Sequence, residues 1–508
     1  MSTRVATALV AAMLLLSGGV AAIDALATPV PAAAPEPVAQ GRATAGVWYC
    51  PMTGGEDDLT VLSVAAAGQR PARVTVVRYT PEGPVAADPL LIDPGELHEV
   101  ALSAEQSAQP LAVRWSGGPA TASVRLQGPT GMAAAPCAEG PQPQWFITGL
   151  DTAAGSSALL HLHNPFTTDA VVEVAFATAD GRIDLMLTDS VLVPAQSAVR
   201  LDLGQFEPER MDLGVALDVR SGRLVAAGEV RMDPLGEQEG PTGRALLAAA
   251  PATSLTWGFA DARQGEAVDS WVTVMNPGDR DAAVEVRVSE PLPDGGALFG
   301  EVTVPAGGVV RLPLGDTSTA SDFGVSLTVV NEVGVVAALV SDIRGQAGRD
   351  LTAATGAPQP ARQWALVGAG TVDRPVVVAV HNPGAEPATV SLTAPGAPEP
   401  WQEVTVGANA RVAFPLGDMA ETAETADVEA EGQGASVPVG VQADRPVVAQ
   451  LRTATSGGDS GAWSTAGVPS AAWTGPARRP AVLRDPTLSR RSTIDAGIDS
   501  GIDSGIGP

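Results

Sequence analysis

The amino-acid sequence predicts an all-β protein of four tandem immunoglobulin-like β-sandwich modules, each of about 110 residues. Three observations support this prediction: an internal repeat, a two-residue apolar period inside each copy, and 43 prolines and 56 glycines spread along the chain. Proline and glycine interrupt helices far more than they interrupt short strands, so long helices are not expected. An alternative is that the same modules close on one another into a compact, pseudo-symmetric ring.

The repeat is visible in two short phrases. Three of the five asparagines precede a proline, at Asn164-Pro165, Asn276-Pro277 and Asn382-Pro383. About 28 residues later each is followed by a second shared phrase: Val193-Pro194-Ala195, Val304-Pro305-Ala306 and Val406-Gly407-Ala408. A repeat of this length is a whole domain and not one coil of a solenoid.

Five tryptophans set the limits of the modules. They are Trp48, Trp145, Trp257, Trp364 and Trp473, separated by 97, 112, 107 and 109 residues. The predicted modules span residues 45–142, 143–253, 254–360 and 361–475. The first is the divergent copy, because it lacks the Asn-Pro phrase. Each repeated tryptophan is expected to anchor a core made otherwise of Val, Leu and Ala, since aromatic residues make up only 4% of the chain.

The strand assignment is clearest in the third module. Apolar residues alternate there between Gly, Pro, Asn and Asp, which is typical of short antiparallel strands. The pattern predicts strands at 257–259, 270–275, 283–288, 300–304, 309–313, 324–329 and 333–340. Seven strands in about 110 residues is the number expected of an immunoglobulin-like sandwich.

The repeated Asn-Pro phrases are interpreted as turns. An Asn side chain can close a turn through its own backbone, and proline fixes φ without leaving a donor unpaired. We therefore expect Asn164, Asn276 and Asn382 to end the first strand of a hairpin, the first in each module.

The amino-terminal region predicts export. Arg4 precedes an uncharged stretch at 5–23, and Ala25-Leu26-Ala27 offers a small-residue cleavage site. Residues 1–27 are therefore a signal peptide or an N-terminal membrane anchor, and 28–44 are a Pro/Ala-rich linker. Both outcomes place the modules outside the cytoplasm, extracellular or in the cell envelope, with membrane contact only through the possible anchor.

Cys50 and Cys137 are the only cysteines. In an exported chain an even pair is expected to form a disulfide, which would join the start of the first module to its end. Two free thiols or a zinc site are the alternatives, and no further cysteine supports zinc.

The charge distribution excludes one class of partner. The formal net charge is −27, and all 30 cationic residues are arginines. An acidic surface repels phosphate backbones, so no nucleic-acid partner is expected. Residues 476–508 differ, because 476–491 contain five arginines and one aspartate, a net charge of +4, before Ile-Asp-Gly-rich units. This segment is predicted to be a disordered tail.

No pattern of residues predicts a reaction, a metal or a cofactor. Gly458-Asp459-Ser460-Gly461 is similar to the nucleophile segment of trypsin-like proteases, but no histidine lies in a matching context. His161 and His163 flank Leu162 on one strand face, where two imidazoles could chelate a metal, yet a third ligand is missing. Packing at the strand end is the favoured role. Acidic loops such as Glu56-Asp57-Asp58 are expected to be solvated.

The sequence resembles a known family. Trp48-Tyr49-Cys50-Pro51, its partner Cys137, the exported amino terminus and the repeated Asn-Pro and Val-Pro-Ala phrases are similar to those of a family of exported actinobacterial proteins of unassigned function. The resemblance implies a role in the cell envelope. It supplies no active site.

The leading functional hypothesis is a non-enzymatic envelope scaffold or protein/glycan-interaction protein, whose partner would be an envelope protein or glycan. As an extended string, its modules would project on the order of 100 Å. The alternative is a carbohydrate-binding accessory or inactive relative of a polysaccharide-processing enzyme. That alternative requires exposed aromatic side chains among the tryptophans outside the repeat frame: Trp115, Trp271, Trp401 and Trp463. A buried cleft joining His161 or His163 to two carboxylates would instead support a secreted hydrolase.

Overall fold

The structure is a computed structural model of the chain. It describes residues 45–52, 54, 55, 57–129, 131–233, 240–289, 298–315, 320–345, 348–367, 376–394, 397, 399–416, 438–453, 463–466, 468 and 469. Several predictions concern residues outside these ranges: the signal segment 1–27, the linker 28–44, Gly458 to Gly461, Trp473 and the tail 476–508.

Within the described ranges the chain is built almost wholly of strands. The helical elements there are α2 (Ala104–Ser107) and the short 3-10 helix η1 (Leu203–Gln205). None of the described helices is long and apolar enough to cross a membrane. The prediction of an all-β chain of sandwich modules is confirmed.

The first module is a sandwich of two antiparallel sheets. One sheet has the order β1-β7-β3-β4, with β5 beside β3, and the other has the order β6-β2-β8-β9. Its strands are β1 (Ala45–Cys50), β2 (Leu59–Ala66), β3 (Ala72–Thr80), β4 (Gly83–Ala86), β5 (Leu90–Ile92), β6 (Leu97–Leu102), β7 (Leu111–Gly117), β8 (Ala120–Gly128) and β9 (Gly131–Pro136).

The second module repeats this topology strand for strand. Its sheets have the orders β10-β16-β12-β13, with β14 beside β12, and β15-β11-β17-β18. Its strands are β10 (Gln144–Leu150), β11 (Ser156–Asn164), β12 (Ala170–Thr178), β13 (Gly181–Asp184), β14 (Val191–Val193), β15 (Ser197–Asp202), β16 (Leu213–Ser221), β17 (Val225–Met232) and β18 (Gly243–Ala248).

The third module has the same strand order, but its two sheets are continuous because the ends of β19 and β20 also pair with each other. Its strands are β19 (Thr256–Gly265), β20 (Val268–Met275), β21 (Ala282–Val288), β22 (Leu298–Val304), β23 (Val309–Pro313), β24 (Asp322–Val329), β25 (Val336–Gly345) and β26 (Gly348–Thr355).

In the fourth module one long strand, β32, serves both sheets. It pairs with β27 and β29 in one and with β28 and β33 in the other. The strands are β27 (Ala361–Leu366), β28 (Val376–Asn382), β29 (Ala388–Thr393), β30 (Gln402–Val406), β31 (Ala410–Pro415), β32 (Val439–Thr453), β33 (Trp463–Ala466) and β34 (Val468–Pro469).

The modules share neighbour relations with an immunoglobulin sandwich and differ from it at their ends. The pairs β2–β6 and β3–β7 correspond to the B–E and C–F pairs of that fold. The first strand, β1, lies beside β7 where the last immunoglobulin strand would lie. The final hairpin, β8–β9, therefore extends the second sheet.

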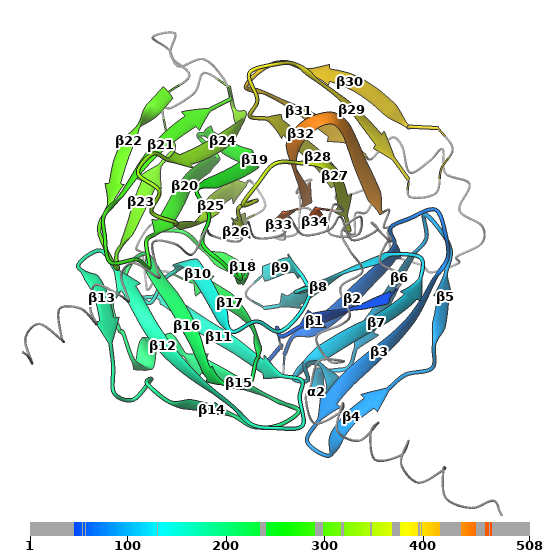
Figure 1. Cartoon of the computed structure of the whole chain (residues 1–508), viewed down its shortest axis with the longest axis vertical. Coiled ribbons are helices and arrows are strands. Elements are labelled where there is room, and N and C mark those ends of the chain that lie inside the picture. The colour runs from blue at the N-terminus through cyan, green and yellow to red at the C-terminus, as the bar shows by residue number, and fades with distance from the viewer. Residues whose placement is uncertain are drawn as a thin grey trace, which may run out of the picture.

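The four modules close into a ring. Strands β9, β18, β26 and β33, one from each module, meet at its centre (Figure 1). Each lies against the next, and β33 returns to contact β9. The extended string considered from the sequence is wrong, and the alternative ring is the observed arrangement. The reason lies in β9 and β18, whose alanine-rich sequences are buried on both faces and so require a neighbour on each side.

The repeated tryptophans occupy equivalent positions. Trp48, Trp145, Trp257 and Trp364 are buried on the first strand of each module. Each indole N–H donates to a backbone carbonyl of the opposite sheet region, 2.7 to 2.9 Å away: those of Ala120, Leu224, Val335 and Val447. A repeated hydrogen bond thus fixes each anchor, which satisfies its polar group inside the core.

The Asn-Pro turns connect the two sheets of a module. The Asn164 side chain donates to the carbonyls of Thr168 and Val193 at 2.7 and 3.1 Å and accepts from the Phe166 N–H at 3.0 Å. Asn276 and Asn382 make the equivalent bonds. The predicted placement in a hairpin is wrong, because β11 and β12 lie in different sheets. The Asn amide closes the crossing by binding the Val-Pro-Ala segment.

The predicted strands of the third module agree with the structure in position and differ at their ends. The prediction 309–313 coincides with β23, whereas 333–340 begins early, since β25 runs from Val336 to Gly345. The prediction 257–259 is too short, because β19 continues through polar residues to Gly265. Strand β26 was not predicted.

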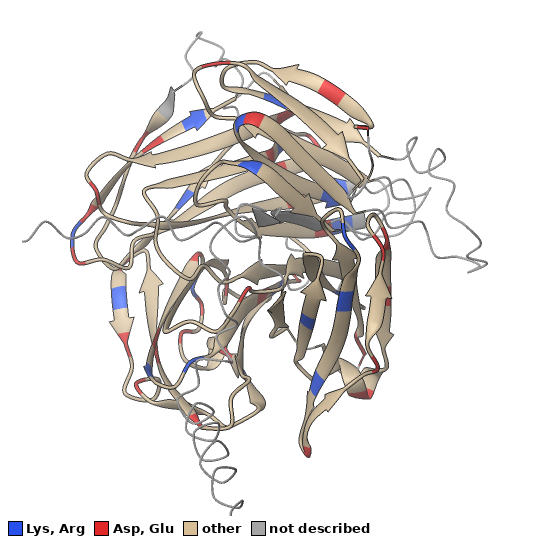
Figure 2. Ribbon diagram, turned by 45° about the vertical axis from the view of Figure 1, so that its right-hand side comes forward, with Lys and Arg blue, Asp and Glu red and all other residues tan. Residues whose placement is uncertain are grey.

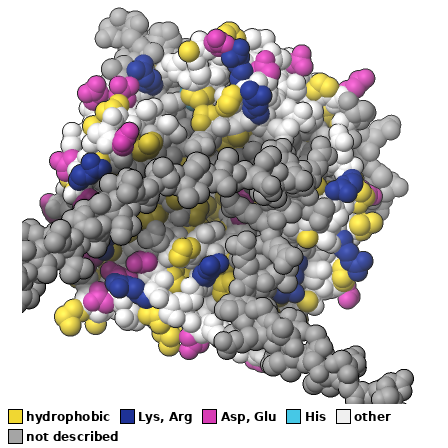
Figure 3. Space-filling view, in the orientation of Figure 1, with side chains coloured by type: hydrophobic (Ala, Val, Ile, Leu, Met, Phe, Trp, Pro, Cys, Tyr) yellow, Lys and Arg dark blue, Asp and Glu magenta, His cyan; other side chains and the backbone are white. Residues whose placement is uncertain are grey.

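Charged side chains of both signs are distributed around the molecule. Acidic and basic positions occur on strands throughout the ring (Figure 2). On the face seen in Figure 3 the two signs are interspersed and neither forms a continuous patch. On that face, therefore, the acidic excess of the sequence is not concentrated in one place.

Candidate functional site

Buried polar and charged side chains from neighbouring modules meet at the junctions. At three of them the residue before the repeated Asn projects into the preceding module: His163, Met275 and His381. The ring of His163 lies edge-on against Tyr79 of the first module, with centroids 4.4 Å apart. Burial lowers the pKa of His163 to about 4, against the opposing effect of the hydrogen bond that its Nδ1 donates to the carbonyl of Ser197.

The other two junction residues are accommodated by glycines. Met275 packs on Ala177 of the second module, and a Cβ at Gly214 would collide with its sulfur. His381 Nε2 lies 2.8 Å from Ser326 Oγ of the third module, and a Cβ at Gly324 would collide with its ring. Burial lowers the pKa of His381 to about 4 as well.

The first module has a small residue at the equivalent position. Ala65 pairs with Thr121 on β8 as His163 pairs with Val225 on β17. Its junction with the fourth module, called the seam below, therefore receives no large side chain from this position.

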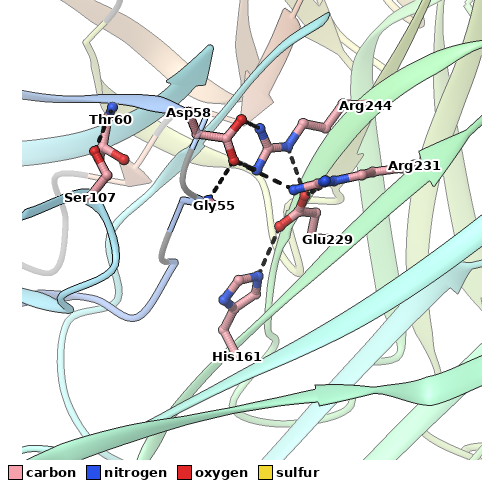
Figure 4. A network of polar contacts seen from close by, with 8 residues as sticks. All are labelled: Gly55, Asp58, Thr60, Ser107, His161, Glu229, Arg231 and Arg244. Carbon is pink, nitrogen blue, oxygen red and sulfur yellow. Dashed lines mark hydrogen bonds and ion pairs between the residues drawn. The ribbon is translucent and has the colours of Figure 1, made fainter. Parts of the chain in front are cut away.

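The junction of the first and second modules contains a buried network of ion pairs (Figure 4). Arg244 on β18 binds Asp58 of the first module through Nη1 and Nη2 at 2.7 and 3.0 Å. Its Nε lies 2.7 Å from Glu229 Oε1, which also accepts from Arg231 at 2.6 Å. His161 Nε2 lies 3.0 Å from the other oxygen of Glu229. Arg244 and Glu229 are fully buried.

Strand register brings these side chains together. Arg231 and Arg244 are directly opposite on β17 and β18, and Glu229 lies two residues before Arg231 on the same face. His161 is on β11, the other neighbour of β17. Burial alone would raise the pKa of Glu229, but the hydrogen bond from His161 and the charge of Arg244 hold it well below its usual range.

Clusters at the other two junctions differ in charge balance. Between the second and third modules Arg311 lies 3.0 Å from Asp212 and over the ring of Trp271. Burial raises the pKa of Asp151 and that of Asp212. The negative charge of Asp151 raises the pKa of Asp212 further.

Between the third and fourth modules the cationic side chains are in excess. Asp261 binds Arg411 at 3.0 Å and lies 3.4 Å from Arg452, and both arginines also face Asp322. Burial, with the nearby charges of Arg452 and Arg411, lowers the pKa of Arg263 to about 10, while Asp261 opposes the shift.

The first network meets part of the condition set for a hydrolase. His161 lies with Glu229 and, through Arg244, with Asp58, and His161 also lines a pocket of about 520 Å³. Both carboxylates are bound by guanidinium groups, which makes them partners in cross-module ion pairs. The expectation that Asp58 is solvated is wrong, because folding places it against Arg244. Among the described residues no group of three or more His, Cys, Asp and Glu side chains is placed to hold a metal ion.

Sequence reasoning missed Glu229 and Arg244. The signal for them was weak: each is a charged residue inside a short apolar strand, where a buried partner is required. The partner of Arg244 lies 186 residues away in sequence, beyond any local pattern.

The predicted disulfide is present. Cys50 at the end of β1 and Cys137 after β9 are bonded, so the first strand of the module is joined to the segment that leaves it. Backbone hydrogen bonds between Tyr49 and Ala138 run beside it.

The seam contains a groove of about 1230 Å³. One side is formed by Trp48, Cys137 and Glu139 of the first module. The other is a row of side chains across the outer sheet of the fourth: Glu403, Ser391, Gln442 and Gln363 on β30, β29, β32 and β27. The segments 248–254 and 355–363, which connect modules, complete the lining.

The tryptophans outside the repeat frame are mostly enclosed. Trp115 and Trp271 are 6% and 7% exposed, and Trp401 is half-buried. The side chain of Trp463 lies outside the described part. Two of the four are thus unavailable for stacking on a sugar.

Comparisons with known proteins give a family without an assigned activity. A model described as "Family of unknown function (DUF5719)" matches residues 106–328 and again 241–494. The two overlapping matches cover most of the chain, and the resemblance to a family of unassigned function is confirmed to this extent. Among curated proteins none matches.

Two solved structures show weak similarity. A tetra-tandem repeat in the extending region of a large adhesion protein is 12% identical, covers 84% of this chain and 99% of its own, and has a TM-score of 0.10. A glycoside hydrolase of family 32 from Bifidobacterium adolescentis is 9% identical, covers 81% and 99%, and has a TM-score of 0.14. Neither score is high enough to indicate a shared architecture.

Proposed function

The chain belongs to the family of unknown function DUF5719, which assigns it no activity. From its geometry we propose that it is an exported, non-enzymatic protein of the cell envelope. In this role the closed ring is a rigid scaffold that presents its loops and outer strands to an envelope protein or glycan. The exported and actinobacterial setting implied by the sequence resemblance is part of this proposal.

The observation that carries the proposal is the use of charged groups at the junctions. Arg244, Glu229 and Asp58 join two modules through buried ion pairs, and Asp261 with Arg411 joins two others. Removing one member of such a pair would leave the other charge buried and uncompensated, so each module depends on side chains of its neighbour. The modules are therefore expected to act as one body, as a scaffold requires.

Two features support export. The bond between Cys50 and Cys137 is of the kind that persists in oxidising compartments. The apolar stretch at 5–23 after Arg4 has the composition of a signal sequence.

The burial of Trp115 and Trp271 favours a scaffold over a carbohydrate-binding accessory, since sugar stacking needs an exposed aromatic face. The paired carboxylates of Glu229 and Asp58 favour a structural over a hydrolytic role for His161, since each already accepts from an arginine.

The test is localisation followed by capture in intact cells. The full chain with a carboxyl-terminal tag should be cleaved by protease added outside cells once the envelope is permeabilised, and its cysteines should resist thiol labelling until reduced. A variant without residues 2–27 serves as the retained control. Crosslinking followed by mass spectrometry should then capture an envelope protein or glycan. A cytoplasmic, thiol-reactive protein with cytoplasmic partners would contradict the proposal.

A catalytic role is tested separately. Purified wild type and a His161→Gln variant should be equally inactive on envelope polysaccharides and peptides. An activity present in the wild type and lost in the variant would replace the scaffold with a hydrolase.

A further inference from the structure

The seam differs from the other three junctions in what fills it. His163, Met275 and His381 fill the junctions that follow the chain, whereas Ala65 occupies that position at the seam. The seam contains the groove of about 1230 Å³ between the first and fourth modules. Smaller pockets of about 520, 590 and 750 Å³ lie between the first and second and between the second and third modules, so the seam is distinguished by the size of its open space.

From this geometry we infer that the groove is the docking site for residues 470–479 of the same chain, Ser470 to Arg479, with Trp473 as the inserted side chain. This segment lies outside the described residues and begins immediately after β34. The inference concerns an intramolecular partner and does not depend on the proposed function.

Strand pairing leads the chain toward the groove. In β34, Pro469 is opposite Trp364 and Val468 is opposite Ala365, in an antiparallel pair with β27. The same register, continued, places Ser470 opposite Gln363 and the next residue opposite Arg362. Gln363 and Arg362 both line the groove. Addition of an extended segment to a strand edge is a general mode of peptide docking.

The internal repeat supplies a second argument. After the first three modules one residue bridges back to the first strand of its own module: Ala138 to Tyr49, Ala250 to Phe146 and Ala357 to Gly258. A repeated tryptophan follows seven residues later in each case and enters the next module.

In the fourth module Val468 makes the equivalent pairing with Ala365, and Trp473 follows five residues later. The next module around the ring is the first, whose own core already contains Trp48. The shorter connection therefore delivers Trp473 to the edge of that module, where Trp48 and Cys137 line the groove.

Charge complementarity is the third argument. The lining contains Glu139, Glu403 and Asp444 against Arg362, a net charge of −3 + 1 = −2. The segment contributes Arg478 and Arg479 and no acidic residue, a net charge of +2. Opposite charges of this kind fix the direction and register of a docked segment and weaken with salt.

The first experiment maps the contacts of residue 473 in the full chain. A photoreactive benzophenone amino acid in place of Trp473 is irradiated, and cross-linked peptides are identified by mass spectrometry. The expected products are intramolecular, joining position 473 to peptides that contain 136–139, 248–254 or 358–363. The same probe in place of Ile498 is the control and should give no such product. Links to other regions, links only between two copies, or no more product than the control would overturn the inference.

The second experiment uses limited trypsin digestion of the folded protein. The bond after Arg478 should be cut at least roughly tenfold more slowly than the bond after Arg491, because docking shields it. The pair Glu403→Gln and Asp444→Asn keeps the acceptor groups and should accelerate cleavage after Arg478 roughly threefold, as removal of exposed ion pairs predicts. Cleavage after Arg491 should not change. Equal rates at the two bonds in the wild type would contradict docking.

Discussion

The first and third junctions of the ring both bury charged side chains between modules, but they differ in the ratio of carboxylates to guanidiniums. Between the first and second modules two carboxylates, Asp58 and Glu229, meet two guanidiniums, Arg244 and Arg231. Between the third and fourth modules three arginines share two aspartates, and burial lowers the pKa of Arg263 to about 10. The balanced network is the more deeply buried, because a low-dielectric interior tolerates only compensated charge.

The middle junction completes the comparison. It has Met275 where the outer junctions have histidine, and Asp151 and Asp212 share one arginine, Arg311. Burial accordingly raises the pKa of Asp151. The junctions therefore lie at equivalent positions of the repeat but contain different side chains. This difference allows each junction to be tested separately by substitution.

The largest effect is expected from breaking the balanced network. Arg244→Met removes the cation at similar volume and leaves Asp58 and Glu229 buried without it. The free energy of unfolding should fall by about 3–5 kcal/mol. Chemical denaturation followed by tryptophan fluorescence measures this change.

The matched control is Arg182→Met, which removes a largely exposed arginine that pairs with Asp184 and Glu173. Its cost should stay below about 1 kcal/mol. Equal effects of the two substitutions would show that the junction does not hold the modules together.

Acid should open the outer junctions before the middle one. His163 and His381 have a pKa of about 4 in the folded protein, against an ordinary value of 6.5. The unfolded state binds these protons first, so stability is lost as the pH falls from about 6.5 to 4, by up to about 3 kcal/mol for each histidine.

The middle junction provides the control for this acid effect. His163→Met and His381→Met copy its side chain and should each remove part of the slope of stability against pH. Thermal denaturation between pH 4 and 7 measures the slope. An unchanged slope in the double variant would exclude the junction histidines as its source.

The disulfide distinguishes the divergent first module from the other three. The double variant Cys50→Ala, Cys137→Ala should lose about 2–4 kcal/mol, chiefly because the unfolded chain regains freedom over an 87-residue loop. The increase in amide hydrogen exchange should be largest in the first module and extend to the junctions that it shares with its neighbours. Faster exchange spread evenly over the four modules would mean that the ring unfolds as one unit.

The features predicted from the sequence are local ones. The alternation of apolar residues predicted the strands, and Asn164 with Pro165 predicted a turn, because strand period and turn chemistry depend on neighbours in sequence. The turn was assigned to a hairpin because successive strands usually pair. Only the pairing of β11 with β15 and β17 shows that the chain crosses between sheets there.

The junctions required the structure. Glu229 and Arg244 appear in the sequence only as charged residues in apolar strands, and His161 appeared as half of an incomplete metal site. Their roles come from partners in another strand or another module, up to 186 residues away. The closed ring likewise depends on β33 meeting β9, a contact between strands of the fourth and first modules.

The smallest effect should come from correcting the excess of acid at the middle junction. Asp151→Asn keeps an oxygen to accept from the Ala153 N–H, now 2.8 Å away, and removes the repulsion of Asp212. A raised carboxyl pKa means that the folded state loses stability as the pH rises through that pKa, so the variant should gain most at neutral pH. The free energy of unfolding should rise by about 0.5–1 kcal/mol at pH 7, and this gain should disappear near pH 4, as denaturation at both pH values can measure.

The same change at the balanced junction, Asp58→Asn, should lower the free energy of unfolding instead, because Arg244 would lose its countercharge. If both substitutions shifted stability in the same direction, charge balance would not be what distinguishes the junctions.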